Sequence, residues 1–236
     1  GVVGVYYFDE TNNDRVIVDL GTPGTSYDTN DIELGTEAFA LFTEWTYDLT
    51  DQLSVTGGLR YTEEEKNMQG TWFNVPVVGS PEPAAPTALC PVVGAPTPGC
   101  LFVTRDVHTE SFDSVTGSAN IAYRFNDAVM AYASVSQGFK SGGFNQRYNA
   151  LLHASGDPLA FDEETAQSYE IGFKANPSSN LRVNGAVFSN SYDDIQLTYR
   201  VGPAPLLFNA GEATINGAEL EVYYMPTDAM TLDFSI

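Results

Sequence analysis

The sequence predicts an all-β fold, part of an antiparallel up-and-down transmembrane β-barrel, from three observations. Apolar and polar residues alternate with period two along most of the 236-residue chain, and helical periodicity is nearly absent. Short turn-forming links alternate with long polar links. The alternating stretches reach the length of about 9–11 residues that a tilted strand needs to cross a bilayer.

The expected strands follow from this alternation. Between Leu53 and Tyr61, for example, odd positions are apolar or Gly and even positions are polar or Gly. The alternation is least clear in the fifth expected strand. The nine expected strands are residues 2–9, 36–48, 53–65, 111–124, 129–139, 165–175, 181–196, 213–225 and 230–236.

The links between these strands are of two kinds. Short links rich in Asn, Asp, Pro, Ser and Thr are typical of tight turns. They alternate without exception with long polar links, so an up-and-down sheet would carry all its short turns on one rim. A soluble sandwich does not need this polarity, whereas an outer-membrane barrel shows it. The short links are 49–52, 125–128, 176–180 and 226–229, and the long ones are 10–35, 66–110, 140–164 and 197–212.

The two faces of the expected sheet differ in polarity. The polar face carries charged residues such as Arg60 and Glu170, which cannot face hydrocarbon cheaply, so it should line a wet or plugged interior. Aromatic residues just before the short turns would form a girdle at the membrane interface. Alternatively they are core aromatics of a soluble β protein. These aromatics are Trp45, Tyr47, Tyr123, Phe173, Tyr223 and Tyr224.

Composition excludes several classes of protein. There are 10 Lys plus Arg against 31 Asp plus Glu, so the sequence lacks the clustered basic residues that nucleic-acid binding requires. The hydrophobic fraction of 43% is too high for a disordered acidic tail. No apolar run is long enough for a transmembrane helix. Both ends read as cuts, so we expect an internal piece of a longer secreted chain.

Cys90 and Cys100 lie in the segment CPVVGAPTPGC. Metal sites usually need tighter pairs and more ligands, and no His lies between the two cysteines. The spacing favours a disulfide that closes a small loop, worth about 3 kcal/mol in the loop-entropy description, in an oxidising compartment. Two free cysteines are the alternative.

Several phrases resemble the TonB-dependent receptors of the Gram-negative outer membrane. EAFALFTEWTYDLTDQLSVTGGLRYTEEEK (37–66) is similar to an early strand–turn–strand of their barrels. The resemblance covers essentially the whole chain, and it implies that residues 1–236 are part of one barrel domain whose plug domain and last strands lie outside the sequence. The other phrases are YASVSQGFKSGGFN (132–145), ETAQSYEIGFKAN (164–176), FSNSYDDIQL (188–197) and FNAGEATINGAELEVYYMP (208–226).

The resemblance also implies a function. It implies a barrel of about 22 strands closed by an internal plug, located in the cell outer membrane, with uptake driven by the TonB–ExbB–ExbD complex through that plug. The expected partners are outer-membrane lipid, lipopolysaccharide and a small ligand. A ferric siderophore is favoured over vitamin B12, haem, nickel complexes and carbohydrates. No cofactor and no enzymatic activity are expected, and the sequence holds no hydrolase, zinc-protease or nucleotide-binding motif.

Candidate ligand-binding residues follow the strand at 129–139. Lys140 and Arg147 flank the segment that ends in Phe144-Asn145. They would attract an anionic ferric chelate while Phe144 and Tyr148 pack against it, with Asn145 beside them. The alternative is a glycine-permitted bend with solvated charges.

Other charged residues have two possible roles each. Arg124, Lys174 and Arg182 lie near short turns on the polar face, where they would pair either with carboxylates of the plug or with acids of the wall itself. The acidic runs 63–65 and 162–164 are expected to form a solvated rim rather than a calcium site, because no spaced calcium loop is present.

Two other kinds of protein fit part of the sequence. One is a passive outer-membrane porin or adhesin barrel, which would lack a plug-like domain before Gly1 in the full-length chain. The other is a soluble extracellular β domain that binds sugar or protein, which would not need detergent for extraction.

Overall fold

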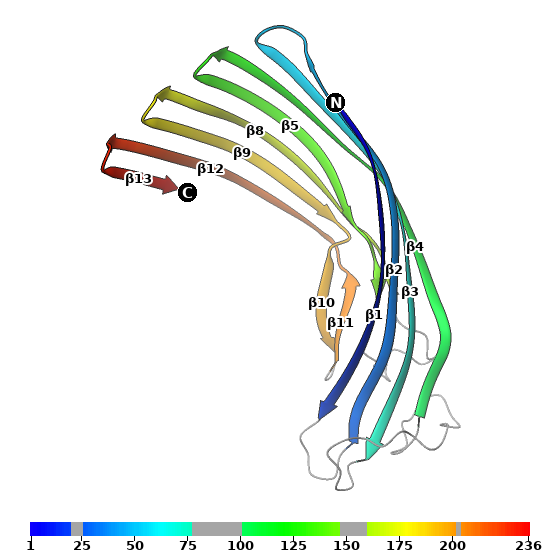
Figure 1. Cartoon of the computed structure of the whole chain (residues 1–236). Helices are drawn as coiled ribbons and strands as arrows, with labels where there is room; N and C mark the ends of the chain where they lie inside the picture. The colour runs from blue at the N-terminus through cyan, green and yellow to red at the C-terminus, as the bar shows by residue number, and fades with distance from the viewer. Residues whose placement is uncertain (20–25, 77–100, 147–159, 202–203) are drawn as a thin grey trace.

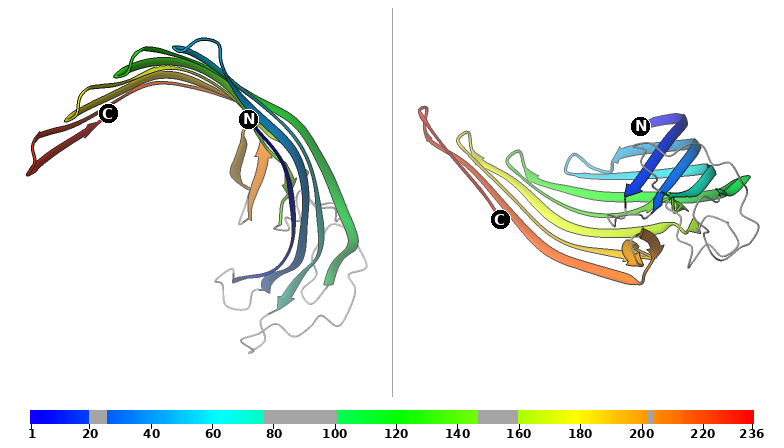
Figure 2. Two further views of the ribbon diagram at one scale, coloured as in Figure 1. Left: turned by 45° about the horizontal axis from the view of Figure 1, so that its top comes forward. Right: turned by 90° about the horizontal axis from the view of Figure 1, so that it is seen from below.

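The computed structural model describes residues 1–19, 26–76, 101–146, 160–201 and 204–236. Nine strands form one sheet in which all neighbours are antiparallel. Figures 1 and 2 show this sheet as a curved open panel, with β1 and β13 at its edges. The strands, in order across the sheet, are β1 (Val2–Asp19), β2 (Ser26–Asp48), β3 (Leu53–Pro76), β4 (Leu101–Asn126), β5 (Val129–Lys140), β8 (Glu164–Ser178), β9 (Leu181–Asp193), β12 (Glu212–Thr227) and β13 (Met230–Ser235).

The predicted all-β fold and its nine-stranded order are confirmed. The four predicted short links are tight turns, and they gather at one end of the panel (Figure 1). Side chains fix these turns locally. Thr50 Oγ1 accepts hydrogen bonds from the backbone N–H groups of Gln52 and Leu53, and Asn126 Oδ1 accepts one from Ala128 N–H. Such bonds are the reason that Thr and Asn favour turns.

The first four strands are much longer than predicted. They have 18, 23, 24 and 26 residues, so the predicted long links at 10–35 and 66–110 are largely strand in their described residues. The strict alternation of apolar and polar residues breaks down in these extensions, as in the wholly polar segment Thr11–Arg15. The backbone ladder therefore continues where the hydrophobic alternation that predicts it has stopped.

Two small ladders occupy the other predicted long links. β6 (Gly143–Phe144) pairs with β7 (Ala160–Phe161), and β10 (Gln196–Val201) pairs with β11 (Ala204–Asn209). Figure 1 shows the β10–β11 hairpin on the inner side of the curved panel. The end of the panel opposite the short turns, where long loops are predicted, therefore contains two short paired ladders.

The sheet has one apolar and one polar face. In register across five strands, Val55, Ile121, Ala133, Ile171 and Val187 mark what we call the apolar face. The exposed fractions of Leu59 and Ile171 on this face are 61% and 64%, so the described part of the chain leaves these side chains uncovered. The next row marks what we call the polar face. That row is Thr56, Asn120, Ser134, Glu170 and Phe188.

Aromatic residues border the apolar face near the short turns. Trp45 and Tyr47 are 60% and 70% exposed, and Tyr123 and Tyr224 lie on the same face. Tyr223 differs from the predicted girdle, because it is in register with Arg182 and therefore lies on the polar face. A strand alternates strictly, so two adjacent tyrosines cannot both face lipid.

The buried apolar cluster of the described residues is small and lies on the outer half of the polar face. Ile32 and Met68 are 1% and 0% exposed, and Leu34 and Phe144 pack against them. Among the described residues, no helix is long and apolar enough to cross a bilayer. The panel buries little on its own, as expected of a wall that meets other surroundings on both faces.

Candidate ligand-binding site

A double kink folds the β10–β11 hairpin toward the polar face. The β9–β12 ladder ends at the pair Asp193 and Glu212, and the β10–β11 ladder begins at Gln196 and Asn209. Between them, Asp194 and Gly211 have φ angles of 54° and 68°, a left-handed conformation that Gly adopts freely and Asp tolerates. The hairpin is thus a continuation of the wall, bent inward (Figure 1).

Asn209 joins this kink to the end of the β5–β8 connection. Its Nδ2 donates to the carbonyl oxygens of Asp162 at 2.9 Å, Glu163 at 3.3 Å and Asp194 at 2.8 Å. Its Oδ1 accepts from Asp162 N–H at 2.7 Å. A single amide side chain therefore holds backbone from two distant segments.

Gln196 holds both ends of the same connection. Its Nε2 donates to the carbonyl oxygens of Ser141 at 2.9 Å and Asp162 at 3.0 Å. Its own backbone N–H donates to Glu164 Oε2 at 2.8 Å. The first residue of the hairpin is consequently bonded to the last residues before β6 and the first residues after β7.

Asn145 makes the third link. Its Nδ2 donates to the carbonyl oxygen of Leu207, and its Oδ1 accepts from the backbone N–H of Leu207, both at 2.7 Å. Asn145 is 7% exposed. This pairing copies that of a neighbouring strand, so it attaches the segment after β6 along β11. We call Asn145, Gln196 and Asn209 the amide pins.

A charged cluster attaches the start of the connection to the wall. Lys66 Nζ lies 3.2 Å from Glu64 Oε1 and donates to the carbonyl oxygen of Gly142 at 2.8 Å. Ser141 Oγ donates to Glu64 Oε1 at 2.7 Å. The expected solvated rim is therefore wrong for Glu64, whose side chain is only 18% exposed, because the connection folds over it. Glu63 and Glu65 on the opposite face remain exposed.

The predicted ligand-binding residues have different surroundings in the structure. Phe144 is half-buried against Ile32 and Met68, and Asn145 is one of the amide pins. Lys140 is exposed at the end of β5, in register with Glu164. Arg147 and Tyr148 lie outside the described residues. The contacts of Phe144 and Asn145 hold the site together, whatever else they touch.

The hairpin presents an apolar surface that the sequence does not single out. Leu197, Tyr199 and Phe208 share one face of the hairpin and are 48%, 59% and 42% exposed. The rings of Tyr199 and Phe208 meet edge to face with centroids 6.1 Å apart, an arrangement that favours a fixed aromatic pair. This surface stands over the polar face rather than on the side that would meet lipid.

The predicted plug-facing residues all lie on the polar face and are exposed. Arg124 and Lys174 share one register row through Met130, and Lys174 Nζ lies 5.8 Å from the centre of the Tyr132 ring. Arg182 Nε donates to Asn176 Oδ1 at 3.3 Å. Within the described ranges, none of the three lies within ion-pair distance of a wall carboxylate.

Two further predictions concern the disulfide and metal binding. Cys90 and Cys100 lie outside the described residues. No group of three or more His, Cys, Asp or Glu side chains among the described residues is placed to hold a metal ion.

Sequence reasoning missed the residues that assemble the site. Asn209 and Gln196 stand inside the phrases FNAG and YDDIQL, which carry the family resemblance, yet nothing in their spacing links them to residues 141–163. Their side chains bond to backbone atoms far away in the sequence, since Asp162 lies 34 residues from Gln196 and 47 residues from Asn209. Only the fold brings these atoms together.

Comparison with known proteins agrees with the fold. The TonB-dependent receptor-like β-barrel family model matches residues 1–235. The pesticin receptor of Yersinia pestis is 25% identical over 185 residues, which cover 78% of this chain and 23% of that protein. A pesticin receptor of Yersinia enterocolitica matches with the same identity and coverage. The chain thus spans about a quarter of the length of these relatives.

Solved structures show the same architecture. The ferric yersiniabactin uptake receptor FyuA from Yersinia pestis has a TM-score of 0.75 at 23% identity, covering 99% of this chain and 31% of that chain. The copper transporter OprC has a TM-score of 0.61 at 12% identity, with 99% and 38% covered. Taken with the match of the family model to nearly every residue, the nine-stranded two-faced panel shows that the chain belongs to the TonB-dependent receptor family, in its β-barrel domain.

Proposed function

We propose that the full-length protein imports a scarce ligand across the outer membrane with energy supplied through TonB, and that this ligand is a ferric siderophore. Members of the family are TonB-dependent outer-membrane receptors, which transport rather than catalyse. The ligand class is supported by relatives named for ferric yersiniabactin and ferric catecholate import. Others carry copper or receive a haem-bearing hemophore, so the choice of ligand needs its own test.

One observation carries the site proposal: the β10–β11 hairpin is folded over the polar face and bonded there by the amide pins. Its exposed Tyr199 and Phe208 offer rings to a ligand that enters on this side. Lys140 supplies positive charge nearby for an anionic chelate. The proposed ligand-contacting set remains Lys140, Phe144, Asn145, Arg147 and Tyr148, to which the hairpin adds its two rings.

The proposed partners follow from the two faces. The apolar face meets outer-membrane lipid, and the acidic outer rim meets lipopolysaccharide. TonB–ExbB–ExbD acts through a plug that lies outside residues 1–236, with Arg124, Lys174 and Arg182 pairing with plug carboxylates. Residues 1–236 are one part of the barrel domain, with Cys90 and Cys100 joined in an external loop. No nucleic-acid partner is proposed for a chain of net charge −21.

Uptake of radiolabelled iron tests the proposal. A strain that lacks the full-length gene should grow poorly under iron limitation and lose uptake of its ferric siderophore, and plasmid-borne protein should restore both only when TonB is active. Uptake that persists without TonB would favour a passive barrel. Recovery of the full-length protein without detergent would favour a soluble domain.

A further inference from the structure

Arg60 is held in a fixed position on the polar face by residues of three strands. It lies in β3, in register with Phe42 of β2 and Thr116 of β4. Its guanidinium carbon lies 5.4 Å from the ring centre of Tyr6 on β1 and 5.8 Å from that of Phe42. Its Nε donates to Thr62 Oγ1 at 2.9 Å, which leaves both Nη groups available for a bidentate partner.

The two rings that seat the guanidinium are themselves fixed. The Phe42 ring covers Gly4, where a Cβ atom would collide with the ring. The Tyr6 ring stacks on Phe8 with centroids 6.4 Å apart. Thr62 beneath the guanidinium is buried, with 6% exposure. Arg60 therefore loses little side-chain freedom when it binds a partner, which favours affinity.

Arg60 differs in its surroundings from the other cations of the described residues. Lys66 has Glu64 as its counter-ion, and the other cations whose burial is described are exposed, namely Arg15, Arg124, Lys140, Lys174, Arg182 and Arg200. Arg60 is half-buried, yet no carboxylate oxygen in the described part of the chain lies within 4.0 Å of it. A partly desolvated cation without a counter-ion is unfavourable, and it is unexpected in a chain with 31 acidic residues.

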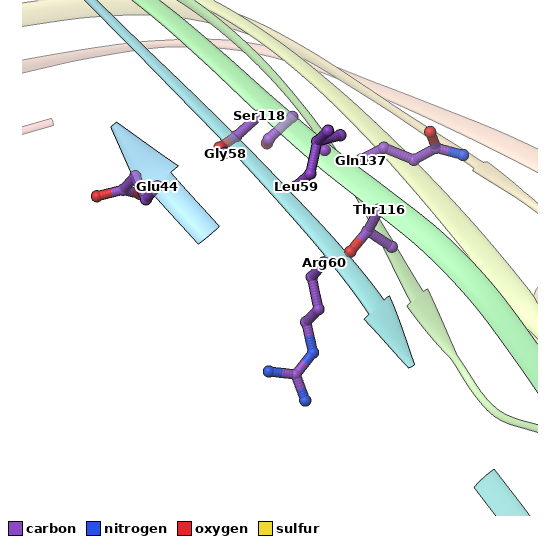
Figure 3. Close-up of a pocket in the computed structure, with 9 residues that line it drawn as sticks. Glu44, Gly58, Leu59, Arg60, Thr116, Ser118 and Gln137 are labelled. Atoms are coloured by element: carbon purple, nitrogen blue, oxygen red, sulfur yellow. The ribbon is translucent and has the colours of Figure 1, made fainter. Parts of the chain in front are cut away.

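A shallow pocket of about 190 Å³ lies beside Arg60 (Figure 3). Thr116, Ser118 and Ser136 supply hydroxyl groups to its wall, and Glu44 also lines it. In Figure 3 the charged ends of Glu44 and Arg60 point in different directions. The pocket is smaller than the usual 300–1,000 Å³, roughly, of a small-molecule site, so it suits one functional group rather than a whole chelate.

We infer that Arg60 is a carboxylate-binding residue whose anion comes from outside the nine strands. A guanidinium fork matches a carboxylate through two parallel N–H···O bonds. Two sources share this chemistry: an acidic side chain elsewhere in the full-length receptor, or a carboxylate borne by a solute that enters the polar side. The inference rests on family membership and on the geometry of Arg60, and its test does not depend on iron transport.

Thermal unfolding of the purified full-length receptor distinguishes the sources. Arg60→Gln removes the charge, Arg60→Lys keeps it, and Arg15→Gln is the control at an exposed arginine. With an internal partner, Arg60→Gln lowers the unfolding midpoint by at least about 2 °C at pH 7 without added anion, and Arg60→Lys lowers it less. With a solute partner, the variants match the wild type until about 10 mM sodium acetate is added, which raises the wild-type midpoint more than sodium chloride of equal ionic strength does.

Acid separates a carboxylate from simple packing. The stability that a carboxylate–Arg60 pair contributes is present above the ordinary carboxyl pKa of about 4 and is lost as the pH falls below it. The deficit of Arg60→Gln should therefore shrink near about pH 3.5. The titratable groups that face Arg60 are Tyr6, Glu44 and Glu64, so Glu44→Gln and Glu64→Gln are run in parallel. The inference is overturned by an equal deficit at both pH values, by a pH effect that disappears in either Glu variant, or by no response to charge or to acetate.

Discussion

Asn209 satisfies its whole amide group on the backbone of two other segments, and it shows how single residues set the geometry of the candidate site. It bonds to the carbonyl oxygens of Asp162, Glu163 and Asp194 and to the N–H of Asp162. An alanine there would leave these backbone groups to find water or remain unpaired. Unmade hydrogen bonds of this kind cost about 1–3 kcal/mol.

We therefore expect Asn209→Ala to loosen the hairpin without unfolding the wall. Backbone amides of Gln196–Val201 should exchange with deuterium about ten-fold faster or more, which corresponds to a loss of about 1.4 kcal/mol in local opening free energy, while those of β9 keep their rate. Hydrogen exchange followed by mass spectrometry on the full-length receptor measures both. Thr198→Ala, at an exposed hairpin position, is the matched control. Equal protection in both variants would contradict the role given to Asn209.

Gly172 leaves room for the Tyr132 ring because it has no side chain. Tyr132 lies directly across from it in register, and a Cβ atom at residue 172 would come within 2.6 Å of the tyrosine ring. The ring lies across the neighbouring strand, and its hydroxyl donates to Glu170 Oε1 at 2.6 Å. The absence of a side chain at 172 therefore allows this contact.

Gly172→Val should destabilise the folded receptor by about 1–3 kcal/mol, since the tyrosine must leave its position. Gly57→Val is the control, because a Cβ atom at residue 57 would meet nothing within 4 Å. Urea unfolding in detergent compares the two variants. The combination of Gly172→Val with Tyr132→Ser should recover part of the loss, and a double variant that is worse than Gly172→Val alone would exclude this explanation.

Among the elements, the kinked hairpin depends most on backbone conformation. Gly211 has a φ of 68° and Asp194 one of 54°. A residue with a side chain raises the free energy of the folded state by about 1–2 kcal/mol when it adopts the left-handed region, and Asp raises it by less than most residues. A Cβ atom added at residue 211 should therefore destabilise the kink, whereas removal of the Cβ atom at residue 194 should not.

Gly211→Ala should lower the protection of the β11 amides, whereas Asp194→Gly should leave it unchanged or raise it slightly. Hydrogen exchange of residues 204–209 reports both. Gly138→Ala is a control in β5, because its Cβ atom would meet nothing within 4 Å. Loss of protection in Asp194→Gly that equals the loss in Gly211→Ala would show that the φ angles do not govern the kink.

At this scale the sequence predicts the parts of each strand that carry alternation. The five strands β5, β8, β9, β12 and β13 have bounds within three residues of those expected, because one face of each is apolar. The outer halves of β1–β4 are not predicted, since the alternation of apolar and polar residues stops in them, as in Thr11–Arg15. The hairpin was not predicted either, because hydrogen bonds to remote backbone fix it and such bonds leave no periodic pattern.

For the whole molecule, the separation of the two faces determines what the panel can be. Successive residues of one strand, Asn120 and Ile121, belong to the polar and apolar faces. Ile121 is 47% exposed, because the described part of the chain places little against it. That exposure is unfavourable in water and favourable in a bilayer, so the pair gives a test of membrane insertion within one strand.

Ile121→Arg should impair folding of the full-length receptor into lipid vesicles by about 2–4 kcal/mol, because a charge near the bilayer midplane must lose its hydration. Asn120→Arg, one residue away on the polar face, should fold nearly as the wild type does. Folding is followed by heat-modifiable mobility on gels. Equal defects in both variants, or none in either, would contradict the assignment of the apolar face to lipid.

The rim on which the two long connections meet could be predicted from the sequence, but the contacts between them could not. The long links after 140 and after 196 were expected on one rim, and they meet there through Gln196 and Ser141. Phe144 and Asn145 were singled out as candidate ligand contacts. In the structure Phe144 packs against Met68 and Asn145 bonds to Leu207. Both contacts are made with residues of other strands far away in the sequence, and the alternation within a strand does not predict them.

The double kink also says how such receptors can vary. The hairpin carries its own ladder of backbone hydrogen bonds, and the chain passes between it and the nine-stranded panel at the residues around Asp194 and Gly211. Residue pairs can therefore be added to or removed from the ladder two at a time, and every remaining side chain then stays on the same face of the hairpin. The hairpin is therefore free to diverge in length, while the nine-stranded panel keeps its register.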